Sequence, residues 1–209
     1  MTNDTGWKLA NADLFWGDLA FCGHTLQVYD TDELYVDAFA GFISTGIHLG
    51  DCCIVIATEA HRNALDQKLM DLGIDVEAVK ADNSYIAVDA YETLSKFIVD
   101  GMPDEQLLGK TMSALFEKAY EAKRLVRAGG EMSAVLFAQG NREAAISLER
   151  MTNKVIETKP FSVFCGFSRT AFPNGEDMIL HHFCAEHSRL IAGSESQSEL
   201  IRYRETAVA

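Results

Sequence analysis

The segment Cys52-Cys-Ile-Val-Ile-Ala-Thr58 decides the fold of this chain. Its unbroken apolar run is typical of a strand that is covered on both faces, as the strands of parallel sheets are. Before it, residues 30–50 open on an Asx-x-x-Glu capping box at Asp30, continue with apolar residues at helical spacing and close on Gly50, which predicts a helix. After it, leucines at helical spacing predict a second helix that ends at Gly73.

The alternation of strands and helices continues on both sides of these elements. Further strands are predicted at residues 24–29, 85–88, 124–127 and 161–165, and further helices at residues 94–98, 103–116, 132–139, 142–157 and 178–186. Strands that are separated by helices pair in parallel through right-handed crossovers. The sequence therefore predicts a three-layer α/β fold, with a mostly parallel sheet between two layers of helices.

The composition restricts the kinds of protein that this chain can be. With 209 residues, of which 48% are hydrophobic, it is long enough for one domain with a substantial core. A formal net charge of −13 repels phosphate backbones, so we expect no nucleic-acid partner. We also expect no membrane partner, because no apolar stretch approaches the roughly 20 residues of a span, and no signal peptide opens the chain. Five cysteines, an odd number inside apolar runs, favour reduced thiols and a cytoplasmic protein.

Doubly wound sheets bind their ligands at the carboxyl ends of the strands. In this chain that edge would carry Tyr29, Glu59, Arg127 and Glu131. Structural interpretations are open as well: Glu59 opens a helix, where the helix dipole favours a carboxylate, and Arg127 and Glu131 could equally form a structural ion pair beside the Gly-Gly turn. The Gly129-Gly130 pair is more informative, because it permits either a close backbone approach or a positive φ between a strand and a helix.

The tripeptide Gly109-Lys-Thr111 has the ending of a phosphate-binding loop. The full motif needs a glycine five positions earlier, after a strand, so that backbone N–H groups surround the phosphates. That position is Asp104, within a segment that reads as a helix, so we interpret the match as accidental. The sequence also lacks the G-x-G-x-x-G and G-x-S-x-G motifs of dinucleotide-binding proteins and α/β-hydrolases.

Two groups of side chains have the chemistry of a metal or thiol site. His181, Cys184 and His187 lie three residues apart, so on a helix they form one stripe that does not easily converge on one ion. Cys165, with His24 or His187 as a spatial partner, has the residue types of a thiol nucleophile. Because a buried cysteine is a common small hydrophobe, we favour structural roles in both cases. We therefore predict no metal site, no cofactor and no catalytic residue.

An ordered series of short blocks adds to these motifs. The blocks are residues 24–29, 46–51, 58–59, 89–94, 100–104, 127–132, 139–141, 148–149, 161–166 and 184–188. In this order they resemble the MEDS domain, the sensory domain named for methanogens, methylotrophs and the regulator DcmR. The resemblance divides the chain into an N-terminal extension (1–20), a MEDS-like sensory domain (21–192) and a loosely packed C-terminal tail (193–209).

The resemblance implies a RecA/KaiC-like sheet that has lost its nucleotide-binding loop. The residues agree, since Val28-Tyr-Asp-Thr-Asp-Glu33, where such a loop would follow the first strand, holds neither glycine nor lysine. Many relatives have Tyr-Pro after the last core strand, where this chain has Gly166-Phe-Ser168. The resemblance further implies a sensing role in prokaryotic signalling. We expect a stand-alone, non-catalytic domain that binds a small ligand, or a histidine kinase or regulator in trans.

The responsive site is predicted at six residues: His24, Tyr29, Glu59, Arg127, Glu131 and His187. Two alternatives stay open. A degenerate ATPase would use Glu59 as its general base. An interaction module would act by oligomerisation, with exposed N-terminal aromatic residues at a homodimer or partner interface: Phe15, Trp16 and Phe21.

Overall fold

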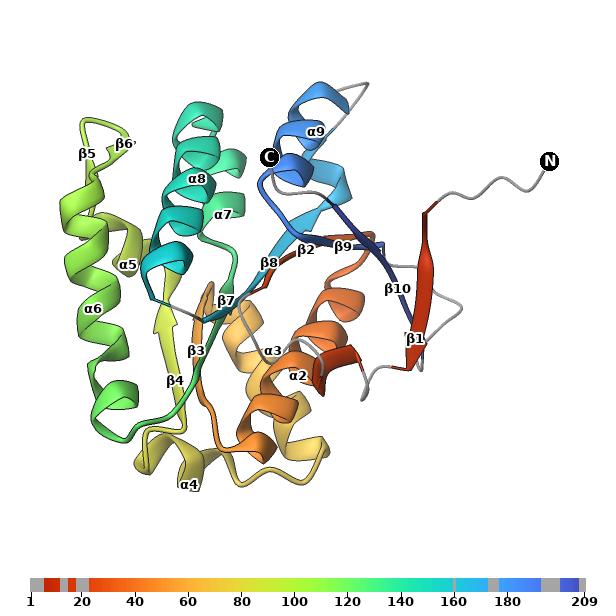
Figure 1. Cartoon of the computed structure of the whole chain (residues 1–209), viewed down its shortest axis with the longest axis vertical. Helices are drawn as coiled ribbons and strands as arrows, with labels where there is room; N and C mark the ends of the chain where they lie inside the picture. Colours follow the sequence, from red (N-terminus) through yellow and green to blue (C-terminus); the bar gives the residue numbers. More distant parts are fainter. Residues whose placement is uncertain are drawn as a thin grey trace.

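An eight-stranded sheet forms the centre of the computed structural model, which describes residues 6–11, 15–17, 23–159, 161–172, 177–192 and 200–206. The strand order is β1-β10-β9-β2-β8-β7-β3-β4 (Figure 1). The strands of this sheet are β1 (Lys8–Asn11), β2 (His24–Tyr29), β3 (Cys52–Ala57), β4 (Tyr85–Asp89), β7 (Val126–Gly130), β8 (Ser162–Ser168), β9 (Arg189–Ala192) and β10 (Leu200–Glu205). A separate hairpin consists of β5 (Ile98–Val99) and β6 (Met102–Pro103).

Parallel pairing dominates the sheet. From β9 to β4 every neighbouring pair is parallel, and only β10 and β1, at one edge, pair antiparallel. All six residues of β3 are buried, because β4 and β7 flank it and helices cover both of its faces. The prediction of a mostly parallel sheet from the apolar run at residues 52–57 is confirmed.

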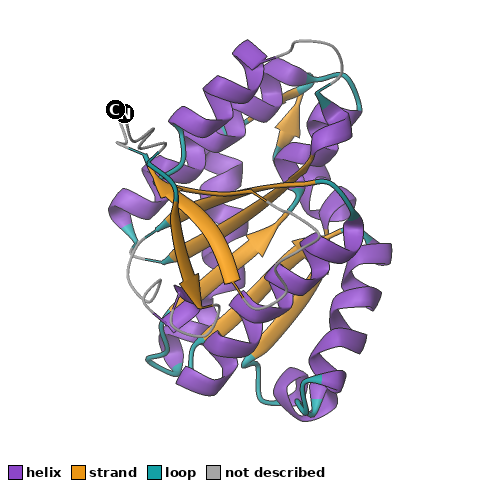
Figure 2. Ribbon diagram, turned by 90° about the vertical axis from the view of Figure 1, so that its right-hand side faces the viewer, coloured by secondary structure: helices purple, strands orange, loops and turns teal. Residues whose placement is uncertain are grey.

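Helices cover the sheet on both faces (Figures 1 and 2). One face packs against α2 (Asp32–Leu49), α3 (Glu59–Asp71) and α4 (Val76–Ala81). The other packs against α5 (Ala90–Ser95), α6 (Glu105–Glu121), α7 (Met132–Ala138), α8 (Arg142–Thr158) and α9 (Asp177–Ala185). A 3₁₀ turn, η1 (Arg169–Ala171), follows β8. Along the described residues, no helix combines the length and the apolar composition that crossing a bilayer requires.

Helix α2 is capped one residue later than predicted. Its N-cap is Thr31, whose hydroxyl accepts a hydrogen bond from the backbone N–H of Leu34. The predicted cap, Asp30, instead accepts a hydrogen bond from Arg169 across 2.6 Å. The predicted end at Gly50 is confirmed, because this glycine adopts a φ of 82° and closes the last turn.

The segment after α5 differs from the prediction. A helix through Ile98 was expected, but α5 ends at Ser95 and the chain forms the β5–β6 hairpin. Asp100 and Gly101 both have positive φ, which gives the hairpin its tight turn. Pro103 therefore lies in β6 rather than in a helix, and Asp104 caps α6 by accepting from the N–H of Leu107.

Both ends of the chain contribute to the fold. Strand β10 lies between β9 and β1, so the prediction of a loosely packed tail was wrong for residues 200–205. Phe15 and Trp16 are 5% and 1% exposed, which contradicts the prediction that these two aromatic residues form an exposed interface. Phe21, the third residue of that prediction, lies outside the described residues.

Candidate functional site

A small cavity of about 60 Å³ lies between the sheet and the helices α6, α7 and α8. Strands β7 and β8 provide its floor, and Leu108, Met112, Leu148 and Val155 are among the apolar side chains of its walls. A water molecule needs about 10–15 Å³ of such space, so the cavity has room for a small organic molecule. Polar side chains in its lining are few: Glu131, Ser133, Glu149, Thr152 and Cys165.

Two of these polar residues belong to a buried cluster of four donor side chains: His24, Glu149, Cys165 and His187. The Nε2 atom of His24 lies 3.4 Å from Cys165 Sγ and 3.2 Å from Glu149 Oε2. His187 Nε2 lies 3.4 Å from the same carboxylate oxygen, and the two imidazole rings are 3.9 Å apart. The four donor atoms all lie within 4.8 Å of one another, although they come from β2, α8, β8 and the segment after α9.

Burial controls the protonation of this cluster. The pKa of His187 is lowered to about 3, first by burial and then by the neighbouring His24. Burial also raises the pKa of Cys165 well above its ordinary value, and the carboxylate of Glu149 raises it further. For Glu149, burial favours the neutral acid, but His187 and His24 outweigh it and lower the pKa. Near neutral pH the cluster therefore holds a carboxylate, a thiol and an uncharged His187.

A second group lies at the carboxyl edge of the sheet. Glu131 follows β7, and its carboxylate accepts a 2.6 Å hydrogen bond from the backbone N–H of Thr58 and lies 2.7 Å from His61 Nδ1. The ring of Tyr29, at the end of β2, stacks on Tyr35 at 4.8 Å. The pKa of Tyr29 is raised by burial and then by the charge of Glu131. Of the predicted residues, Tyr29 and Glu131 thus share one environment.

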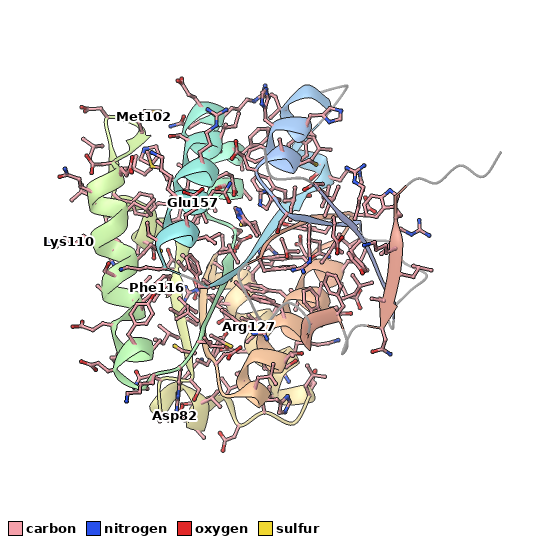
Figure 3. The ribbon with its side chains drawn as sticks, viewed as in Figure 1. Asp82, Met102, Lys110, Phe116, Arg127 and Glu157 are labelled. Carbon is pink, nitrogen blue, oxygen red and sulfur yellow. The ribbon has the colours of Figure 1, made fainter. Side chains whose placement is uncertain are left out.

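Arg127 does not reach this edge. It is the second residue of β7, whose bounds are shifted from the predicted strand at 124–127. The side chain is 1% exposed and lies between the sheet and α2 (Figure 3). Its Nε donates to Asp51 at 2.6 Å and its Nη1 to the carbonyl oxygen of Trp16 at 3.0 Å. The predicted ion pair with Glu131 is therefore wrong, and the position of Arg127 is that of a structural residue.

The six predicted site residues thus fall into four places. His24 and His187 meet in the buried cluster, and Tyr29 and Glu131 lie together at the carboxyl edge. Glu59 is exposed at the start of α3, and Arg127 is buried between the sheet and α2.

The tripeptide at residues 109–111 lies inside α6. This position agrees with its interpretation as an accidental match to a phosphate-binding loop.

Sequence reasoning missed two acidic or basic residues of these groups, Glu149 and His61. A usable signal exists for Glu149: it follows Leu148 on the apolar stripe of α8, where a charged residue is unexpected. The stripe of His181, Cys184 and His187 does not converge, since His181 is exposed while His187 is buried. The donors that do converge are separated by up to 163 residues, so local spacing contains no trace of them.

Comparison with known proteins agrees with this architecture. A solved structure from Pyrococcus horikoshii OT3 has a similar fold, with a TM-score of 0.59 at 12% sequence identity. The alignment covers 90% of this chain and 89% of that one. Comparison with the curated proteins found no match. The family model described as MEDS, the MEthanogen/methylotroph, DcmR Sensory domain, matches residues 23–187. The chain therefore belongs to the MEDS family of sensory domains.

Proposed function

We propose that this MEDS domain senses a small, mostly apolar molecule in the cavity between the sheet and helices α6–α8. The observation that carries the proposal is the lining of this cavity: mostly apolar side chains, with a few polar groups from α7, α8 and β8 among them. Binding sites for small molecules have this composition, because apolar contacts give affinity and a few polar groups fix orientation.

The position of Glu131 supports a sensing role. This residue lines the cavity, and its carboxylate also bonds to Thr58 and His61 at the carboxyl edge. Gly129 and Gly130, the last residues of β7 before the turn into α7, also line the cavity. A ligand that displaces this turn would therefore change the contact between Glu131 and His61. The side chain of His61 is 14% exposed, so this change would reach the surface. The signal would then pass to a histidine kinase or regulator in trans.

The alternative of a degenerate ATPase receives no support. After β2 the chain continues as Asp30-Thr31-Asp32, and Thr31 already caps α2. Two carboxylates at this helix start repel a phosphate group. We propose that the sheet is RecA/KaiC-like with this loop lost, and that the domain is non-catalytic. Calorimetry with ATP and Mg²⁺ is expected to give no binding at submillimolar nucleotide; binding in that range would favour the ATPase.

The ligand proposal is tested by filling the cavity. Small organic molecules, either apolar or with one polar group, are screened against the full chain by NMR chemical-shift changes. Ala128 lines the cavity, so Ala128→Leu occupies its space and is expected to weaken binding at least tenfold. The matched control is Ala114→Leu on the exposed side of α6, which adds the same atoms outside the cavity. Equal binding by both variants, or shifts confined to other surfaces, would contradict the proposal.

A further inference from the structure

Three distances between donor atoms of the buried cluster are close to those of a tetrahedral metal site. Bond lengths of about 2.0–2.1 Å from zinc to nitrogen or oxygen and about 2.3 Å to sulfur place neighbouring ligand atoms about 3.3–3.6 Å apart. His24 Nε2 lies 3.2 Å from Glu149 Oε2 and 3.4 Å from Cys165 Sγ, and His187 Nε2 lies 3.4 Å from Glu149 Oε2. The pair Cys165–Glu149 is slightly wider, at 4.0 Å. The side chains are therefore already spaced as ligands of one ion.

Hydrogen bonds outside the cluster set the tautomer of each histidine. His187 Nδ1 lies 2.6 Å from the carbonyl oxygen of Phe183, which only accepts, so this nitrogen carries the proton. His24 Nδ1 lies 2.8 Å from Asn153 Oδ1. The amide nitrogen of Asn153 donates to Glu186, which fixes its oxygen toward His24. Metal-binding histidines typically donate their second ring nitrogen in this way. As a result, the Nε2 atoms of both rings face the cluster.

The cluster contains a buried polar atom without a partner. Among the described residues, His187 Nε2 has no hydrogen-bond partner, although the side chain is 0% exposed. A carboxylate oxygen of Glu149 lies 3.4 Å from it, and two unshared electron pairs that face each other repel. A cation between the two atoms would replace this repulsion with two attractive contacts.

We propose that His24, Glu149, Cys165 and His187 bind one divalent metal ion of the zinc class. Two imidazole nitrogens, a sulfur and a carboxylate oxygen form a donor set that suits zinc and is unsuitable for Mg²⁺ or Ca²⁺, which require oxygen ligands. Binding forms four coordination bonds and breaks the S–H bond of Cys165, whose proton passes to solvent. A dication, a thiolate, a carboxylate and two neutral imidazoles sum to zero charge, which suits a buried site.

This proposal goes beyond ligand sensing and stands without it, because none of its arguments uses an occupant of the cavity. The competing arrangement is a proton in place of the metal. The side chains would then be joined only by hydrogen bonds, and Cys165 would stay a thiol. That arrangement leaves His187 Nε2 without a partner, whereas a metal satisfies all four donors.

The test uses the full chain, stripped with a chelator and titrated separately with Zn²⁺ and Co²⁺. We expect one ion per chain by elemental mass spectrometry. We also expect the Co²⁺ form to show tetrahedral visible bands and a near-ultraviolet absorption from thiolate-to-cobalt charge transfer. Cys165→Ser is expected to abolish the charge-transfer absorption, and His187→Gln to weaken Co²⁺ binding at least tenfold.

Matched controls are Cys184→Ser and His182→Gln, which change the same residue types on α9 outside the cluster. Both are expected to leave the spectrum and the stoichiometry unchanged. Less than a stoichiometric amount of metal, or a charge-transfer absorption that survives Cys165→Ser, would overturn the proposal.

A second measurement covers the case in which the variants do not fold. X-ray absorption at the zinc edge of the unmodified protein reports the ligand atoms directly. One sulfur and three nitrogen or oxygen neighbours are expected, and a zinc shell without sulfur would count against the site. Because neither experiment adds an organic ligand, failure here would leave the cavity proposal standing, and failure of the ligand screen would leave this one standing.

Discussion

A buried arginine is stable only where its charge is paired, and Arg127 meets this condition through Asp51 and the carbonyl oxygen of Trp16. Both charged side chains are almost fully buried, at 1% and 8% exposure. The guanidinium also lies 5.4 Å from the centre of the Phe42 ring. As a residue type, an arginine fits a ligand site equally well. The structural role of Arg127 follows from its position near the start of β7, away from the carboxyl edge.

We expect Arg127→Ala to destabilise the fold by about 3–5 kcal/mol, because it leaves the Asp51 carboxylate buried without a partner. The measurement is the free energy of unfolding in urea. The control is Arg124→Ala, since Arg124 pairs with a half-exposed Asp82 and is expected to cost less than about 1 kcal/mol. Equal effects of the two substitutions would show that burial does not strengthen the Arg127 pair.

The His61–Glu131 pair predicts a dependence of stability on pH. The pKa of His61 is raised above 6.5, first by its hydrogen bond with Glu131 and against the effect of burial. Burial acts to raise the pKa of Glu131, but the bonds from His61 and Thr58 lower it below 4.5. The contribution of His61 to the free energy of unfolding is fully present below pH 6.5 and is lost as the pH rises through its pKa in the folded state. The carboxylate contribution is complete above pH 4.5 and is lost as pH falls.

The pair therefore stabilises the protein most between pH 4.5 and 6.5. We expect the unfolding free energies of the unmodified protein and His61→Gln to differ most in this window and to converge as pH rises toward about 9. Denaturant titrations at several pH values measure this difference. The exposed His181→Gln is the control and is expected to show no such window. A constant difference from pH 5 to about 9 would contradict the assignment.

At the scale of elements, two adjacent glycines let β7 approach its neighbours. A Cβ atom on Gly130 would lie 1.9 Å from the carbonyl oxygen of Ile56, and one on Gly129 would lie 2.5 Å from the ring of Phe39. The first contact is with the backbone of β3, which cannot move without breaking the β3–β7 ladder. The interpretation of this pair as a close backbone approach is thus correct, and the approach is to a strand and to α2.

Gly130→Ala is expected to destabilise the protein by about 1–3 kcal/mol or more, because the added methyl group forces β3 and β7 apart. Gly109→Ala is the matched control, since nothing lies within 4 Å of its Cβ position in α6. That change is expected to stabilise the helix by about 0.5–1 kcal/mol. Urea unfolding measures both effects, and two changes of the same sign would show that backbone crowding is not the cause.

Elements with local signals were predictable, and elements that depend on distant partners were not. Strand β3 is apolar throughout, and α2 and α8 have caps or apolar stripes in their own sequence. Strand β10, by contrast, has three charged residues among its six and no continuous apolar run, and it exists through its pairing with β1 and β9. The hairpin at residues 98–103 replaced a predicted helix because a tight turn at Asp100-Gly101 outweighed the apolar spacing.

At the scale of the whole molecule, the topology of the chain brings together donor side chains whose spacing in the sequence gives no sign that they are neighbours. The buried cluster takes one donor from β2, one from α8, one from β8 and one from the segment before β9. Two of its members, His24 and His187, were predicted from the sequence as site residues and as possible spatial partners of Cys165, and His24 Nε2 does lie 3.4 Å from Cys165 Sγ. They lie beneath α8 and α9, where His24 contacts Asn153 and His187 contacts the carbonyl oxygen of Phe183. His24 begins β2, so it lies away from the carboxyl edge. The carboxyl-edge rule locates strand ends and says nothing about the space beneath a helix layer.

The N-terminal segment is part of this whole-molecule assembly. The ring of Trp16 packs against Phe42 of α2 and Phe164 of β8, with centroid distances of 5.7 and 5.6 Å. Its carbonyl oxygen also accepts from Arg127. Trp16 is thus held in the core of its own chain, so its replacement should affect stability rather than association.

Trp16→Ala is accordingly expected to cost about 3–5 kcal/mol of unfolding free energy, because it opens a large cavity between α2 and the sheet. The molar mass of the folded protein by light scattering should stay that of the unmodified chain. Trp7→Ala provides the comparison, since Trp7 is only partly buried and contacts Arg204 at 5.5 Å. It is expected to cost about 1 kcal/mol. If Trp16→Ala instead lowered the molar mass of the assembly and left the free energy of unfolding unchanged, an N-terminal interface would be the better explanation. Loss of a contact between two chains would produce that combination, and loss of a core contact would not.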